Sequence, residues 1–267
     1  EIENMMVGHT FAAERYRESE QAEPASEIAL VVRDLSKRGA FEPISFSVRK
    51  GEIVSLVGLV GSGKEELSRC IAGLEKPDSG SITLNGKRLV HGSPKETVRS
   101  GLGHIPIDRR SEGLALGMSV ADNVNLLVLD RLMVAGLLSP SLEKKNALRL
   151  IEECGVRTPA YSALCGNLSG GNQQKVVIAK WLSSKSRFLV LDHPTRGVDV
   201  GAKEEIYKLI RKLSSDGIAM VIMCDTLEED IGLSHRMLVM KDGRLVGEVC
   251  CPRDKKPGPN ELISLIV

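Results

Sequence analysis

The sequence predicts an α/β fold in which parallel strands and helices surround a phosphate-binding loop. Three stretches carry this prediction. Residues 58–64 read GLVGSGK and lie between an apolar strand pattern and a helical pattern. Residues 168–175 read LSGGNQQK and lead into an apolar pattern with helical spacing. Residues 187–191 read RFLVL, an unbroken apolar run typical of a buried parallel strand, and an aspartate follows them.

The composition narrows the possible classes of function. The chain has 267 residues, enough for one large domain or two small ones, and 36 Lys and Arg nearly balance 35 Asp and Glu. The formal charge of +1 supplies no field that would attract nucleic acid. The six cysteines show no metal-binding spacing, so we expect reduced thiols, as in the cytosol. No apolar run reaches the roughly 20 residues that span a bilayer, so a membrane role requires a partner.

The first part of the chain reads as strands. Alternating or continuous apolar residues predict strands over 28–32, 44–48 and 52–57. Residues 81–90 read as a hairpin around Asn85-Gly86. Ser93, followed by a proline, predicts the capped start of a helix over 94–100, and a strand over 102–105 comes next.

The glycine-rich loop before the first long helix is the first candidate site. Gly61 and Gly63 permit a tight loop whose backbone amides wrap phosphates, and Lys64 reaches the phosphate oxygens. The motif requires Ser or Thr after the lysine, because that hydroxyl ligates magnesium, but Glu65 stands there. The candidate nucleotide-binding residues are Gly58, Leu59, Val60, Gly61, Ser62, Gly63, Lys64 and Glu65.

The second candidate site is the turn at residues 168–172. Ser169 stands where a helix N-cap is expected, and two glycines let another group approach the backbone. Free N–H groups and the positive end of the helix dipole suit a phosphate. The candidate residues are Leu168, Ser169, Gly170, Gly171 and Asn172.

The remaining elements complete an alternating α/β pattern. Residues 119–165 read as helices with loops, and the buried strand at 187–191 places Asp192 at its carboxyl end. We expect a helix to about residue 215, strands over 218–224, 237–240 and 244–250, and a loop and short helix over 251–267.

The motifs together resemble the nucleotide-binding domains of ABC transporter ATPases, in the form used by sugar importers. LSGGNQQK resembles the signature motif of that family, and TRGVDVGAK at 195–203 nearly repeats its sugar-importer form. The resemblance covers roughly residues 28–250. It implies an ABC-type P-loop NTPase core with a small antiparallel β subdomain. It also implies a helical subdomain at about 106–165. MMVG at residues 5–8 resembles the end of a first ATPase half, so residues 1–27 are expected to be a linker from a preceding half.

Four positions depart from the working pattern of this family. By resemblance, Ile107 replaces a glutamine that contacts metal and water, His193 replaces the glutamate that polarises the attacking water, and Asp225 replaces a switch residue that senses the γ-phosphate. Glu65 is the fourth. Asp192 matches the family's aspartate that holds a magnesium-bound water, but only as a weak metal site. The expected site is therefore degenerate, and this half alone is expected to be hydrolytically inactive.

The exchanged residues suggest a specific contact. The acid and the imidazole look swapped rather than deleted, so we expect His193 and Asp225 to pair with each other where the γ-phosphate lies in working relatives. The alternative is that these are two unrelated residues, each solvated.

The resemblance also implies the partners. In this family two nucleotide domains face head to tail, so the intact signature serves the P-loop of a preceding half or a second copy, with Asp199 at their interface. ATP and magnesium are the implied cofactors, weak or absent at this half's own site. Transmembrane permease subunits and, indirectly, a periplasmic sugar-binding protein are implied at the cytoplasmic face of the cell membrane, with no nucleic acid.

The leading hypothesis is therefore an ATP-binding domain of an importer for a monosaccharide or related polyol. Two alternatives stay open: a repair or translation-factor ATPase of the same superfamily, and a structural domain that binds no nucleotide. The stretch before the signature carries no sustained heptads, and residues 8–27 are neither long nor basic, which disfavours the first alternative.

Overall fold

A six-stranded sheet forms the centre of the computed structural model, which describes residues 16–90 and 93–266. Its strands are β3 (Ile53–Val57), β6 (Leu102–Ile105), β9 (Phe188–Asp192), β10 (Ala219–Met223), β11 (Arg236–Lys241) and β12 (Arg244–Cys250). Their order across the sheet is β12-β11-β3-β10-β9-β6. All neighbours are parallel except β12, which pairs antiparallel with β11 at the edge.

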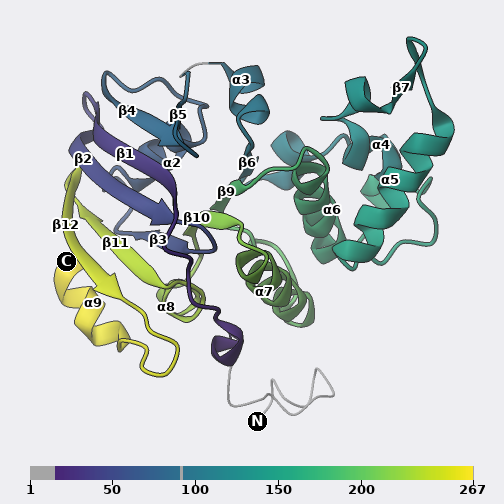
Figure 1. Cartoon of the computed structure of the whole chain (residues 1–267). Helices are drawn as coiled ribbons and strands as arrows, with labels where there is room; N and C mark the ends of the chain where they lie inside the picture. Colours follow the sequence, from purple (N-terminus) through teal and green to yellow (C-terminus); the bar gives the residue numbers. More distant parts are fainter. Residues whose placement is uncertain (1–15, 91–92, 267) are drawn as a thin grey trace.

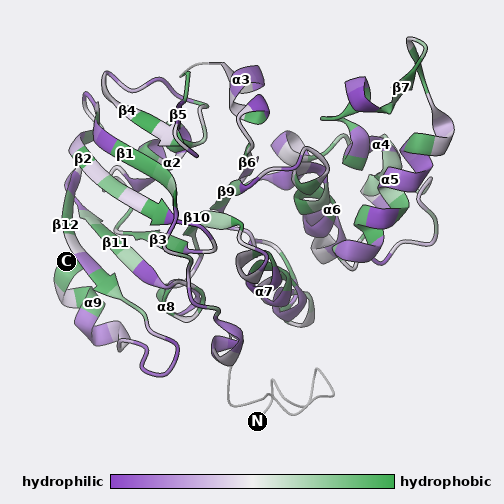
Figure 2. Cartoon of the chain, in the orientation of Figure 1, coloured by the Kyte–Doolittle hydropathy of each residue, from purple (hydrophilic) through white to green (hydrophobic). Residues whose placement is uncertain are grey.

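The five parallel strands are buried on both faces, to which successive residues point in turn, whereas the edge strand β12 is partly exposed. In β9, Leu189 and Leu191 join a core with α6 (Gly170–Ser183) and α7 (Val200–Ser215), whereas Phe188 and Val190 join a second core. That second core includes residues of α2 (Lys64–Ile71) and of a separate antiparallel sheet. The double burial explains the unbroken apolar runs in the sequence, which appear as green strands in Figure 2.

The antiparallel sheet lies on the left of Figure 1 and has the order β2-β1-β4-β5. Its strands are β1 (Ile28–Lys37), β2 (Phe41–Arg49), β4 (Ser79–Leu84) and β5 (Lys87–Arg88). The β4–β5 hairpin turns at Asn85 and Gly86, which both adopt positive φ, as the sequence predicts.

A group of helices lies on the right of Figure 1, beyond β6. It comprises α4 (Val120–Asn125), α5 (Pro140–Glu153) and the signature helix α6, which pack on one another. A π-helix (Arg109–Gly113) connects β6 to this group. Within it, β7 (Met133–Val134) and β8 (Leu137–Leu138) form a short hairpin that the sequence, read as helices with loops, does not predict.

The N-terminal end of the described chain is anchored on α7 and on α8 (Leu227–Leu233). The Tyr16 ring packs edge-on against Tyr207, with ring centroids 5.4 Å apart. A Cβ added at Gly232 would lie 2.2 Å from the Tyr16 ring. Arg211, only 2% exposed, donates hydrogen bonds to the backbone oxygens of Gly232 and Leu233 beneath this contact. The predictions for residues 1–15 lie outside the described residues.

The structure confirms the predicted α/β core with its antiparallel sheet and helical group, but the predicted helix cap at Ser93 is wrong. Ser93 precedes α3 (Pro94–Arg99) but makes no capping bond with its side chain. The six cysteines are free thiols, as expected, and a short helix α9 (Pro259–Ile266) closes the chain. Within the described part of the chain, no helix has the length and apolar character needed to cross a bilayer.

Candidate functional site

The phosphate-binding loop connects β3 to α2, and close packing explains its glycines. Gly61 and Gly63 adopt φ of 85° and 89°, values that L side chains rarely adopt. A Cβ at Gly63 would lie 2.5 Å from the backbone oxygen of Ala40, and one at Gly58 would lie 2.3 Å from that of Met240. The top of the loop faces solvent, since Val60 is 94% exposed.

The loop offers a phosphate both a cation and an unused polar atom. Lys64 is 9% exposed, and its Nζ lies 2.6 Å from Glu65 Oε1 and 3.4 Å from the Leu59 carbonyl oxygen. The Ser62 hydroxyl is buried and has no hydrogen-bond partner. The residues of this loop therefore fit a phosphate group.

Each carboxylate oxygen of Asp192, by contrast, contacts a protein group. The Ser68 hydroxyl donates to Asp192 Oδ1 at 2.6 Å, and His104 Nε2 lies 2.8 Å from Asp192 Oδ2. Asp192 is only 8% exposed. With Glu65 in place of the expected hydroxyl and the exposed Ile107 in place of a polar group, these residues do not fit a magnesium ion.

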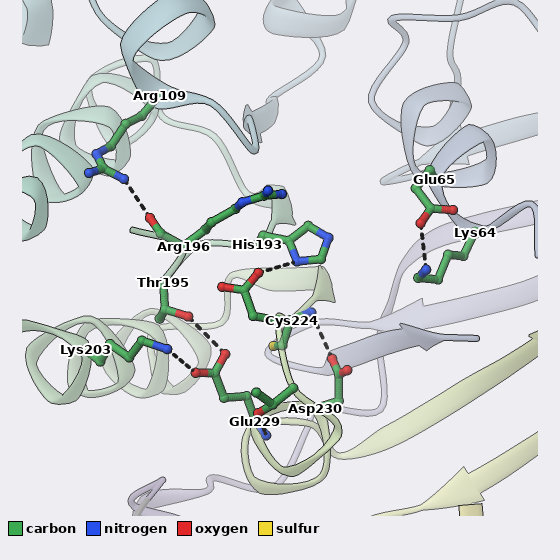
Figure 3. A network of polar contacts seen from close by, with 12 residues as sticks. Lys64, Glu65, Arg109, His193, Thr195, Arg196, Lys203, Cys224, Glu229 and Asp230 are labelled. Atoms are coloured by element: carbon green, nitrogen blue, oxygen red, sulfur yellow. Dashed lines mark hydrogen bonds and ion pairs between the residues drawn. The ribbon is translucent and has the colours of Figure 1, made fainter. Parts of the chain in front are cut away.

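His193 and Asp225 lie together, as predicted from their exchanged chemistry. His193 Nδ1 is 3.1 Å from Asp225 Oδ1, and the two follow the neighbouring strands β9 and β10 (Figure 3). The angle is not that of a hydrogen bond, since Nδ1 is left without a hydrogen-bond partner. The contact is therefore an ion pair whenever the imidazole is protonated. The His193 backbone has φ of 51°, held by its N–H donating to the Met223 oxygen at 2.8 Å.

A buried carboxylate beneath this pair ties three segments together. Glu229 on α8 accepts hydrogen bonds from Thr195 Oγ1 at 2.9 Å and Lys203 Nζ at 2.8 Å (Figure 3). It also accepts one from the Tyr207 hydroxyl at 2.7 Å. Burial acts to raise the pKa of Glu229, but the bonds from Lys203 and Tyr207 outweigh it, and the pKa is lowered. Glu229 thus joins the loop after His193, the helix α7 and the helix α8.

The neighbouring Asp230 is a second buried acid. It accepts a hydrogen bond from the Ser55 hydroxyl, and the Cys224 backbone N–H donates to it at 3.1 Å. Burial raises the pKa of Asp230 to about 7, against an ordinary value of 3.8. No motif in the sequence marks Glu229 or Asp230.

The signature turn begins α6 as predicted, but its serine does not cap the helix. Ser169 occupies the N-cap position and makes no side-chain bond to the helix backbone. Its hydroxyl instead accepts a hydrogen bond from Asn172 Nδ2 at 3.0 Å, while Asn172 Oδ1 accepts one from the Arg157 backbone N–H at 2.8 Å. Ser169 is exposed, and Leu168 packs on the core behind it.

The two signature glycines are required by neighbours within the chain. A Cβ at Gly171 would lie 2.5 Å from the Ala202 Cβ, and one at Gly170 would lie 2.6 Å from a terminal nitrogen of Arg109. Arg109 donates to the backbone oxygen of Arg196 at 2.7 Å (Figure 3) and to that of Gly197 at 3.1 Å. Arg109 therefore joins the signature turn to the loop that follows His193, a role that sequence reasoning missed.

Asp199 ends that loop as the N-cap of α7. Its Oδ1 accepts a hydrogen bond from the Ala202 backbone N–H at 2.9 Å, and the residue is exposed. The capping bond fixes the start of α7 beside Gly171. Asp199 thus lies on the same exposed surface region as the signature turn.

The parallel sheet, the glycine loop between β3 and α2 and the buried lysine define a P-loop nucleotide-binding domain. Residues 41–196, more than half of the chain, match the family described as "ABC transporter". The chain belongs to the ABC transporter family.

The similar proteins agree with this assignment. A ribose import ATP-binding protein of Corynebacterium glutamicum is 42% identical over 252 residues, which are 93% of this chain and 47% of that protein. A putative ribose/galactose/methyl galactoside import ATP-binding protein of Rhizobium etli is 40% identical, over 92% of this chain and 46% of that protein. The chain spans about half the length of these relatives.

Solved structures show the same fold. A nucleotide-free ATP-binding cassette from an ABC transporter superposes with a TM-score of 0.73 at 22% identity, over 90% of this chain and 99% of that chain. An ATP-binding subunit of an ABC transporter superposes with a TM-score of 0.70 at 23% identity, over 89% and 99%.

Proposed function

We propose that this chain is the second nucleotide-binding domain of the ATPase subunit of an importer for a monosaccharide or related polyol. Its signature turn serves the ATP site of a preceding domain, or of a second copy, and its own P-loop site does not hydrolyse ATP. The names of the relatives, which include ribose import ATP-binding proteins, support sugar as the transported class.

A contrast between the two surfaces carries this proposal. The signature turn, with Ser169 and Asp199 exposed, is open to an incoming partner. In the P-loop site, Asp192 is closed by Ser68 and His104, and Lys64 is paired with Glu65. An asymmetric pair requires an exposed signature turn and a P-loop site whose Asp192 and Lys64 are already paired with protein groups.

The partners follow from the same proposal. The helices α4, α5 and α6 form the side that docks on transmembrane permease subunits, and a periplasmic sugar-binding protein acts indirectly through them. The domain then works peripherally at the cytoplasmic face of the cell membrane. A translation-factor or repair ATPase is disfavoured, because the described chain between β6 and α6 holds only short elements and no long coiled coil.

The test uses the complete subunit assembled with its permease. Ser169→Arg abolishes transport and ATP hydrolysis, because it obstructs the surface that meets the partner's ATP. Lys64→Ala retains most of both, since the P-loop site of this half is not hydrolytic. Ser162→Arg, at another exposed serine ahead of the signature turn, is the matched control and leaves transport unchanged. Equal loss in the Ser169 and Lys64 variants would refute the asymmetric pair.

A further inference from the structure

We propose that the P-loop of this chain holds a nucleoside diphosphate without a divalent cation and discriminates against magnesium-bound nucleoside triphosphate. The inference rests on the proposed function, since it takes residues 58–65 as a nucleotide site. It goes further by naming the ligand and by removing the metal from it.

The loop retains what a metal-free phosphate needs. Gly61 and Gly63 keep positive φ values, typical of loops whose backbone N–H groups bind a phosphate, the Ser62 hydroxyl is buried without a partner, and Lys64 supplies a buried cation. Each of these groups is a hydrogen-bond donor that acts without a metal.

Glu65 acts as a displaceable stand-in for the phosphate. Its side chain is 37% exposed, whereas that of its partner Lys64 is 11% exposed. An ion pair with one solvated member contributes little to stability, so a phosphate that approaches Lys64 can displace the carboxylate into water. A phosphate ester then replaces one short charge-assisted contact with another.

The metal, by contrast, has lost its ligands on the protein. Magnesium requires near-octahedral oxygen ligands and releases its waters reluctantly. Asp192, which could help to hold those waters, is 8% exposed and already contacts Ser68 at 2.6 Å and His104 at 2.8 Å. In residues 16–90 and 93–266, no group of three or more His, Cys, Asp or Glu side chains is placed to hold a metal ion.

A third phosphate would meet acidic groups at the same edge of the sheet. β10 lies between β3 and β9, so the segments that follow these three strands converge, about 4.8 Å apart per strand. Those segments carry Glu65 and the His193–Asp225 pair, and Asp192 is the last residue of β9. Figure 3 shows Lys64, Glu65 and His193. Without magnesium, a terminal phosphate is repelled by the carboxylates, whereas a diphosphate ends before it reaches them.

The experiment measures displacement of a fluorescent ADP analogue, N-methylanthraniloyl-ADP, from the 267-residue chain. ADP and ATP compete in excess EDTA and again in excess magnesium chloride. ADP is expected to bind at least about fivefold more tightly than ATP in EDTA, and magnesium is expected to change the ADP affinity by less than about twofold. ATP bound more tightly than ADP in magnesium, or no binding of either nucleotide, would overturn the inference.

Two variants and a matched control test the named residues. Glu65→Gln keeps the size of the side chain and removes its charge, and we expect it to raise ATP affinity about fivefold relative to ADP. Glu66→Gln, one position further along α2, leaves the ratio unchanged. Lys64→Ala loses ADP affinity by more than about tenfold while its circular dichroism spectrum shows a folded domain. An unchanged ratio of ATP to ADP affinity in Glu65→Gln would refute the proposed discrimination between the two nucleotides. Failure of the proposed function would be seen in a different measurement, because transport would then survive Ser169→Arg.

Discussion

Replacing Glu229 by alanine tests whether this carboxylate is the main polar connection among its three segments. The side chain accepts three hydrogen bonds, from Thr195, Lys203 and Tyr207, and the residue is 3% exposed. Removing one partner from a buried ionic network costs about 3–5 kcal/mol, because the remaining groups stay desolvated. For a chain of this size, that loss lowers the melting temperature by roughly 10 °C.

The control is the neighbouring residue of the same type. Glu228 is exposed on the same helix, and Glu228→Ala is expected to change stability by less than about 0.5 kcal/mol. Differential scanning calorimetry of both variants at neutral pH measures the difference. A loss of less than about 1 kcal/mol for Glu229→Ala, or equal losses in the two variants, would show that the network carries little free energy.

The pH dependence of stability under acidic conditions gives a second test of Glu229. The pKa of Glu229 is lowered from the ordinary 4.5, since the bonds from Lys203 and Tyr207 outweigh the opposing effect of burial. The charged form therefore stabilises the fold above pH 4.5, and this contribution is lost as pH falls through the folded-state pKa. The stability difference between wild type and Glu229→Gln should shrink below pH 4.5, and a constant difference would contradict the assignment.

Two further predictions concern Asp230 and Gly232. Burial raises the pKa of Asp230 from 3.8 to about 7, so its contribution to stability is present below pH 3.8 and is lost as pH rises through 7. The stability of Asp230→Asn relative to wild type, measured in urea titrations, should therefore increase between pH 3.8 and 7. A stability difference that does not change with pH would contradict this prediction. Gly232→Ala places a Cβ 2.2 Å from the Tyr16 ring and should lower the free energy of unfolding by about 1–3 kcal/mol. The control Gly117→Ala, whose Cβ would have no atom within 4 Å, should be nearly neutral. Equal melting temperatures for the two variants would refute the contact with Tyr16.

The fold was predictable because its signals are local. The buried strands β9 and β10 are nearly continuous apolar runs, and the β4–β5 turn carries Asn85 and Gly86 at positive φ. The hairpin β7–β8 escaped prediction because its strands have two residues each, too few to show a period.

The candidate site was predictable only where one motif holds the residues. The contact between His193 and Asp225 followed from complementary chemistry at two motif positions. Ser68 and His104 were missed because they meet Asp192 through the packing of α2 and the pairing of β6 with β9, which the sequence does not display. Ser169 was predicted to cap its helix, but the nearby amide of Asn172 is a competing donor.

The anchoring of Tyr16 determines where mechanical load enters the domain. The ring rests on Tyr207 of α7 and on Gly232 of α8, and Arg211 clamps the carbonyls of Gly232 and Leu233 below it. A tether that pulls on the chain before Tyr16 therefore loads these two helices ahead of the first strand. Since α7 starts at Val200, after its N-cap Asp199, and α8 starts at Leu227, such a pull also acts on the loops that precede these two helices.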